Sequence, residues 1–475
     1  TISATRTNSL VKNTPISLTV INEELMQDLN ILNDQDLVRA TASVTLDPDG
    51  FSLNQLRIRG FRSLTQRYDL FWREITRDGY NIQRVDIVKG ANSLMYGQAD
   101  PGGQINSVPK VAQHNKNSVS LKGTVGSNDY TRGEFDINHV INDEIAVRVM
   151  GVDFRRELDQ LYEYSDVQGA TMELSYRPND KSQFRAHIEY IELDQNLAPG
   201  MFQTTAGDSR FQANSRASET DNNEVFTLGA YRNEFIYSPD AVDYIPQGII
   251  NDLEFSQGYA NALYGGDTTV TRDKLNQVYT PWASQDDRYS VTGPDKYNRR
   301  DGLVTTFDWT QKISDTLQSK IAFNREATNR ESLARDGFSA GRVTSDAAGP
   351  RAYDPYVRTY WRKQEGTSEA NAIKSTLLWD IEPGNDIPIF GNSEHKLLFG
   401  VDWDHLTRDP KVYEQVQDGT MLRDGSYFRG NDLLNEQFYL SDGFGPGTPN
   451  IGFNGRDDLF VLKQNNEFKS QTSSL

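Results

Sequence analysis

The feature that most restricts the fold of this chain is a two-residue alternation of apolar and polar side chains. Phe184, Ile188 and Tyr190, for example, are separated by polar or charged neighbours. Successive side chains of a strand point to opposite faces, so each such segment predicts a strand with one apolar face. The alternating segments that mark these strands, without the polar residues at the strand ends, lie at 119–125, 135–141, 145–155, 170–176, 184–190, 303–309, 317–323, 370–381 and 397–403.

The length of these predicted strands separates two kinds of β-protein. Soluble antiparallel sandwiches also alternate, but their strands usually have about five or six residues. Here the strands have about nine to twelve residues, which is the length that a tilted strand needs to cross a bilayer. Aromatic residues also recur near the strand ends, as in the interface girdles of membrane barrels. The sequence therefore favours a transmembrane β-barrel, and the aromatic residues concerned are Tyr176, Tyr190, Trp309, Trp379 and Trp403.

The composition agrees with this interpretation and excludes other classes. Only every second strand residue of a barrel meets lipid, which is compatible with a mean hydropathy of −0.66. The formal net charge is −18 and no basic stripe is visible, so we expect no nucleic-acid partner. The chain has no Cys, which excludes thiolate metal sites, disulfides and cysteine nucleophiles within it. It begins at Thr1 without a signal peptide, as after removal of a signal or in a fragment of a longer protein.

The connections between the predicted strands differ in length in a regular way. Short ones at 142–143, 178–181 and 314–316, and a moderate one at 382–394, alternate with long ones. Bacterial outer-membrane barrels have short periplasmic turns and long external loops. We therefore expect the long connections to lie outside the cell, and they are at 158–167, 195–300, 328–365 and 408–465.

Residues 1–112 differ from the rest and predict a mixed α/β domain. Strands are expected at 16–21, 56–59, 85–88 and 105–108, with short helices starting near residues 22 and 34. Asn22 is a suitable cap for the first helix. We therefore divide the chain into an N-terminal domain, residues 1–112, and a barrel region with long extracellular loops, residues 113–475.

The N-terminal domain resembles the plug of TonB-dependent outer-membrane receptors, especially the siderophore (ferrichrome-type) group. The order and spacing of several motifs match that family. Two departures are Lys89-Gly90-Ala91, where the family usually has Arg-Gly-Pro, and a short segment between Phe61 and Tyr80. The matching motifs are Ala4–Thr7, Pro15–Ile21, Leu56–Phe61, Gln83–Gly90, Asn92–Gly97 and Pro101–Asn106.

This resemblance implies an α/β plug inside an antiparallel transmembrane β-barrel of 22 strands. Such a barrel would need about 700 residues, whereas about nine or ten strands are present here. We therefore expect the chain to be truncated at its C-terminus, with residues 468–475 as a strand cut short.

The resemblance also implies a function. Receptors of this group bind a ferric siderophore above the plug and import it with energy that TonB and its inner-membrane complex deliver. We therefore expect a location in the outer membrane of a Gram-negative bacterium, contact with outer-membrane lipid, and no cofactor apart from the transported ferric siderophore. The alternatives are a receptor for cobalamin or an oligosaccharide, or a secreted β-rich carbohydrate-binding protein.

We expect no enzymatic activity. Gly337–Gly341 matches G-x-S-x-G, but a nucleophile elbow needs a strand before it and a helix after it. The segment lies in a polar stretch with no helical pattern following. The five His are scattered without metal-ligand spacing, so no metal site is expected.

The site residues are expected from the resemblance. Arg59 and Lys89 occupy plug positions that pair with glutamates on the barrel wall in the family, which implies a plug–barrel latch. Gln66 and Trp72 fall on ligand-contact positions of ferrichrome-type plugs. Phe202, early in the longest connection, is a further candidate for ligand binding.

Overall fold

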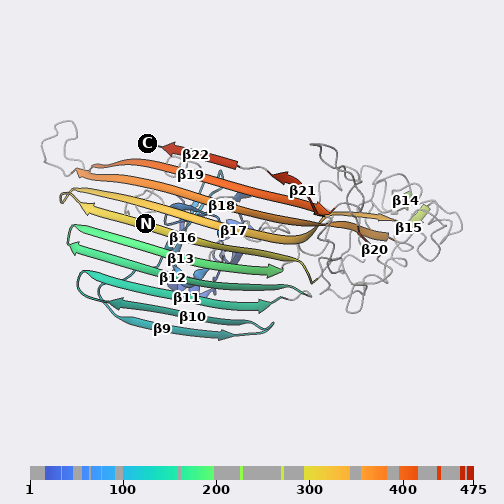
Figure 1. The fold of residues 1–475 in the computed structure, drawn as a ribbon, viewed down its shortest axis with the longest axis horizontal. Coiled ribbons are helices and arrows are strands. Elements are labelled where there is room, and N and C mark those ends of the chain that lie inside the picture. The colour runs from blue at the N-terminus through green and yellow to red at the C-terminus, as the bar shows by residue number, and fades with distance from the viewer. Residues whose placement is uncertain are drawn as a thin grey trace.

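Two sheets make up most of the computed structural model (Figure 1). A small mixed sheet is formed by the N-terminal residues, and a large antiparallel sheet by the rest. The structure describes residues 17–33, 35–46, 56–63, 66–75, 78–90, 100–158, 162–196, 225–227, 269–271, 294–342, 355–381, 395–415, 436–439, 460–465 and 468–474.

The small sheet has five strands in the order β1-β7-β8-β5-β6. These strands are β1 (Leu18–Asn22), β7 (Ile82–Lys89), β8 (Gly103–Pro109), β5 (Gln66–Tyr68) and β6 (Phe71–Arg73). Around it lie α1 (Glu23–Asp28), the 3₁₀ turns η2 (Gln35–Arg39) and η3 (Gly79–Asn81), and a three-stranded sheet of β2 (Val44–Leu46), β3 (Leu56–Ile58) and β4 (Phe61–Ser63). Among the residues that the structure describes, no helix is both long enough and apolar enough to cross a membrane.

The N-terminal domain has an apolar core of its own. Ile21, Leu37, Leu56, Ile87 and Ile105 are among its fully buried side chains. The predicted cap of the first helix is confirmed, because Asn22 Oδ1 accepts a hydrogen bond from Leu25 N at 3.0 Å. The sequence of elements therefore agrees with the mixed α/β prediction.

All nine predicted strands are present in the large sheet, and they pair in sequence order. Two shorter strands, β21 (Phe460–Asn465) and β22 (Phe468–Ser474), both pair with β19 and together occupy the tenth position. The nine are β9 (Ser118–Val125), β10 (Thr131–Val140), β11 (Ile145–Glu157), β12 (Tyr164–Asn179), β13 (Ser182–Asn196), β16 (Tyr297–Lys312), β17 (Leu317–Arg342), β18 (Pro355–Ile381) and β19 (His395–Gln415). Smaller pieces are β14 (Val225–Thr227), β15 (Thr269–Thr271) and β20 (Glu436–Tyr439).

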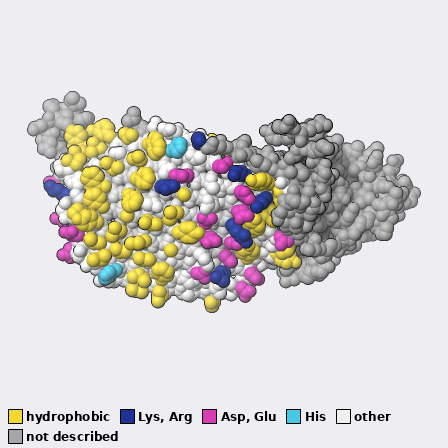
Figure 2. Space-filling model, viewed as in Figure 1, with side chains coloured by type: hydrophobic (Ala, Val, Ile, Leu, Met, Phe, Trp, Pro, Cys, Tyr) yellow, Lys and Arg dark blue, Asp and Glu magenta, His cyan; other side chains and the backbone are white. Residues whose placement is uncertain are grey.

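The apolar face of each strand points outward, away from the N-terminal domain. Phe184, Phe307 and Phe399, for example, are 41%, 50% and 57% exposed. Figure 2 shows a broad band of apolar side chains on the outside of the wall, with a zone of charged side chains beside it. The opposite face is rich in buried polar residues such as Glu173, Glu189 and Glu326. This apolar-outside, polar-inside alternation is that of a membrane barrel wall.

The strands are longer than predicted, and this corrects the connection between β17 and β18. The sequence predicted a loop at 328–365, but β17 continues to Arg342 and β18 starts at Pro355. Beyond the apolar band neither face of a strand meets lipid, so the alternation disappears although the ladder continues. Residues 329–332, for example, are all polar or charged.

The short connections lie where they were predicted. β10 and β11, β12 and β13, and β16 and β17 are joined by turns at one end of the sheet, and the strand ends that flank the long connections lie at the other end (Figure 1). The last strand of the small sheet ends at Pro109 and β9 begins at Ser118, with the proposed domain boundary after residue 112 between them.

Candidate ligand-binding site

The hairpin of β5 and β6 presents two chemically different faces. The register pairs Arg67 with Trp72 and Gln66 with Arg73, so Arg67 and Trp72 share one face. Ring contacts agree, because the Arg67 guanidinium carbon lies 5.9 Å from the Trp72 ring centroid. On the other face, the Arg73 guanidinium carbon lies 4.3 Å from the Tyr68 ring. Gln66 therefore lies on the face opposite Trp72.

The hairpin turn has an uncommon backbone. Asp69 and Leu70 have φ of 47° and 73°, which suits a two-residue turn between strands but strains residues other than Gly, Asn or Asp. The neighbouring strand β8 holds this turn, since Asp69 N donates to the backbone Ser107 O at 2.8 Å and Leu70 N donates to the side-chain Oδ1 of Asn106 at 2.9 Å. Burial alone would raise the pKa of Asp69, but the positive charges of Lys320 and Arg185 lower it.

Buried charges fasten the end of this hairpin to the large sheet. Arg73 forms a bidentate pair with Glu189 of β13, with both N–O distances 2.8 Å and both side chains almost fully buried. Burial alone would lower the pKa of Arg73, but the Glu189 carboxylate raises it and keeps the guanidinium charged. Glu326 of β17 accepts hydrogen bonds from the backbone N–H groups of Glu74 and Ile75 at 2.8 and 2.7 Å. Three consecutive residues are thus anchored to two wall strands.

The following segment adds a second set of anchors. Asp78 accepts two hydrogen bonds from Arg132 of β10, at 3.0 and 2.6 Å. The hydroxyl of Tyr80 lies 2.6 Å from that of Thr171, and burial raises the pKa of Tyr80. Apolar packing accompanies these bonds, because Ile75 and Tyr80 belong to one buried cluster with seven wall residues. Those residues are Met150, Val152, Phe154, Val167, Ile191, Leu193 and Val304.

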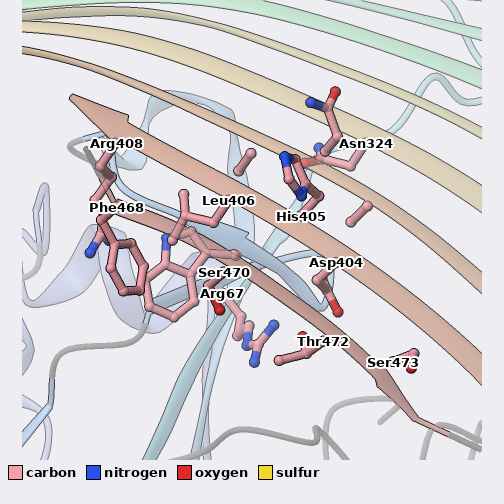
Figure 3. A pocket seen from close by; sticks show the side chains of 14 residues that line it. Arg67, Asn324, Asp404, His405, Leu406, Arg408, Phe468, Ser470, Thr472 and Ser473 are labelled. Carbon is pink, nitrogen blue, oxygen red and sulfur yellow. The ribbon is translucent and has the colours of Figure 1, made fainter.

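A cavity of about 330 Å³ lies between the Trp72 face of the hairpin and the inner surface of β17, β18, β19 and β22. Arg67 and Trp72 line it from the hairpin, and Arg408 and Phe468 line it from the wall. Figure 3 shows Arg408 and Phe468 at one end of the cavity and Thr472 and Ser473 toward the other. The cavity offers cationic groups, aromatic surface and hydroxyl groups within one volume, which suits a polar ligand with an apolar rim.

The structure brings only part of the predicted ligand site together. Trp72 lines the cavity, half-buried, and among the described residues its indole N–H has no hydrogen-bond acceptor. Gln66 lies on the other face of the hairpin and does not line the cavity. Phe202 lies outside the described residues. The ligand-binding roles of all three residues stay predictions.

The predicted latch residues, Arg59 and Lys89, are not among the anchors described above. Arg59 is exposed, with φ of 53°, and its guanidinium lies beside Gly90, next to Lys89. Within the described residues no ion pair joins Arg59 or Lys89 to the wall, so their latch role stays a prediction.

The sequence analysis missed the residues that do make buried contacts between the domain and the wall. Glu189 lies on the polar side of the strand predicted at 184–190, and Glu326 lies just beyond the strand predicted at 317–323. Neither of them was singled out, and nor was Arg73. The available signal was a charged residue at an inward position in the middle of a strand, which needs a partner of opposite charge when it is buried.

Comparison with known proteins identifies the N-terminal domain. Residues 11–104 match the TonB-dependent Receptor Plug Domain. Residues 11–104 are a TonB-dependent receptor plug domain. The small sheet and its helices are therefore the plug, and the large sheet is the barrel wall around it.

Relatives support this assignment at moderate identity. The catecholate siderophore receptor Fiu of Escherichia coli K12 is 24% identical over 345 residues, covering 66% of this chain and 44% of that receptor. The probable siderophore receptor PiuA of Acinetobacter baumannii is 33% identical over 144 residues, covering 29% of this chain and 19% of PiuA. The chain spans less than half the length of these relatives.

Solved structures show the fold of this receptor chain. The ferripyoverdine receptor of Pseudomonas aeruginosa superposes with a TM-score of 0.65 at 14% identity, over 100% of this chain and 50% of that one. PiuA superposes with a TM-score of 0.62 at 15% identity, over 97% of this chain and 54% of the PiuA chain. A plug inside a transmembrane barrel is thus the fold, and the outer membrane of a Gram-negative bacterium is its location.

Proposed function

We propose that this chain is part of a receptor that binds a ferric siderophore above its plug and imports it with energy supplied through TonB. The observation that carries the proposal is the cavity between the plug hairpin and the wall, with Trp72 and two arginines around it. Relatives named as catecholate siderophore and ferripyoverdine receptors support the same ligand class. The ferrichrome-type subgroup is supported by the sequence resemblance alone.

The position of the cavity suits uptake from outside the cell. Its wall residues Ala370, Leu406 and Arg408 lie beyond the apolar band on β18 and β19, toward the long connections. If these connections are extracellular, a ligand reaches the cavity before it meets the core of the plug. The function is then binding and gated transport, without covalent chemistry.

The partners follow from the mechanism. Passage of a chelate past the plug requires the anchors at Arg73 and Asp78 to yield, and the outer membrane offers no nucleotide to supply that energy. We therefore propose TonB, with its inner-membrane complex, as the energising partner on the periplasmic side. The transported ligand is the ferric siderophore itself, and the receptor needs no resident cofactor.

Uptake measurements test this function. Cells that express the receptor should accumulate radiolabelled iron from at least one ferric siderophore, and should stop when TonB is absent. Equilibrium binding to the purified receptor, with cobalamin and an oligosaccharide as control ligands, separates binding from transport. Binding of a control ligand alone would contradict the iron assignment and leave the receptor family unchanged.

A further inference from the structure

One ion pair links the plug to the wall at the edge of the cavity. Glu74 follows β6, and its carboxylate contacts the guanidinium of Arg408 on β19. The same guanidinium carbon lies 5.6 Å from the Trp72 ring centroid, and Arg408 lines the cavity. The carboxylate of Glu74 therefore pairs with the Arg408 guanidinium, which a ligand in the cavity would also contact.

This pair differs from its neighbours in accessibility. The side chains of Arg73 and Glu189 are 3% and 0% exposed, whereas those of Arg408 and Glu74 are 37% and 23% exposed. A solute cannot reach the first pair without unfolding the interface. It can reach the second pair, and an exposed ion pair is weak enough to be exchanged.

We propose that Arg408 selects anionic chelates, and that an anionic oxygen of the ligand takes the place of the Glu74 carboxylate on it. This inference rests on the proposed function. Arg67, whose guanidinium carbon lies 5.9 Å from the centroid of the same indole, adds a second positive charge near the ligand. Trp72 and Phe468 supply flat apolar area.

The combination specifies a chemical class of ligand. Guanidinium groups favour negatively charged oxygens, and aromatic side chains favour flat rings. A ferric tris-catecholate has both, since its metal is surrounded by negatively charged phenolate oxygens on aromatic rings. A neutral ferric trihydroxamate has neither the net charge nor the rings. Asp404 also lines the cavity, toward the end away from Arg408 (Figure 3), so the anion is expected at the Arg408 end.

Exchange at Arg408 has a mechanical result. Once the ligand occupies Arg408, Glu74 no longer has this wall contact, and the segment 73–75 is held by the Glu189 and Glu326 anchors and by the packing of Ile75. Ligand binding would thereby remove one plug–wall contact at the residue next to the Arg73 anchor.

Two substitutions with opposite expected effects test the proposal. In the purified receptor, Glu74→Gln should tighten binding of a ferric tris-catecholate by about 3- to 10-fold, because the competing charge is removed. Arg408→Gln should weaken it by about 10- to 100-fold, and Arg408→Lys should retain most of the affinity. Binding of a neutral ferric trihydroxamate should change less than about 3-fold in each variant.

The matched control is Arg325→Gln on β17. Arg325 pairs with Glu369 at 3.2 Å, is 55% exposed, and lies on the outward face of the wall, so its loss should leave both affinities unchanged. Weaker catecholate binding by Glu74→Gln, or equal losses for both chelates in Arg408→Gln, would overturn the proposal. If the unmodified receptor binds the trihydroxamate and not the catecholate, the anion selectivity fails while the siderophore function stands. If it binds neither, the proposed function fails as well.

Discussion

At the scale of single residues, a few buried charges fasten the plug to the wall, together with the apolar packing of Ile75 and Tyr80. Arg73 and Glu189 satisfy each other with two short hydrogen bonds, and Glu326 satisfies two backbone N–H groups. Each carboxylate would be costly to bury without its donors. The energetic consequence of losing one donor is therefore larger than that of losing an exposed pair.

Replacing Arg73 by Gln should loosen the plug while the barrel stays folded. The substitution leaves Glu189 buried without its partner, which costs about 3–5 kcal/mol. Hydrogen exchange should then show reduced protection of the backbone amides in residues 66–75 and 78–90. Arg299→Gln is the control, because Arg299 pairs with Asp194 on the outward face and is 54% exposed. The double change Arg73→Met and Glu189→Met should recover most of the protection, and equal protection in all variants would refute the anchor.

Truncating Trp72 to Ala should weaken siderophore binding by about 1–3 kcal/mol, or roughly 5- to 150-fold. The indole supplies a large part of the aromatic surface of the cavity. Trp72→Phe retains a ring and should lose less. Gln66→Ala should change affinity little, because its side chain lies on the other face of the hairpin. Equilibrium binding to the three variants measures this, and undiminished affinity of the Ala variant would remove Trp72 from the site.

At the scale of elements, the sequence predicts where strands exist better than where they end. All nine strands were predicted because one face of each meets lipid and must be apolar. The ends of β17 and β18 could not be predicted, because that selection stops at the edge of the bilayer. The β5–β6 hairpin was missed for a different reason, since its strands have only three residues each and Asp69-Leu70 is not a typical turn pair. The cavity could not be predicted either, because it joins the β5–β6 hairpin to wall strands far away from it in the sequence.

The orientation of the strands leads to a prediction about topology. An epitope tag in the long connection between β13 and β16 should be labelled on intact cells. A tag at 314–316, in the turn between β16 and β17, should be labelled only after the outer membrane is permeabilised. Labelling of the second tag alone on intact cells would reverse the orientation and place the cavity near the periplasm.

At the scale of the whole molecule, the proposed transport would require the plug to move relative to the wall. The chain contains no Cys, so two introduced cysteines can form a disulfide only with each other within it. Asn81 and Thr171 are suitable, because their side chains are hydrogen-bonded at 2.9 Å across the interface. Oxidised Asn81→Cys/Thr171→Cys receptor should bind ligand normally but not import it, and a reductant should restore uptake. Full uptake by the oxidised form would show that this part of the plug does not leave the wall.

The apolar band on the outer face also determines which bilayer the receptor fits. On β16 and the turn after it, outward apolar side chains run from Leu303 to Ile313. Ten residue steps of about 3.3 Å, on a strand tilted by about 40°, give a hydrophobic height of about 25 Å. This is less than the hydrocarbon core of about 30 Å in a typical bilayer. Thicker bilayers would have to thin around the protein or bury its charged zone. The receptor should therefore reconstitute most readily into lipids with short acyl chains. The thickness of a membrane would then help to decide whether the protein is stable in it.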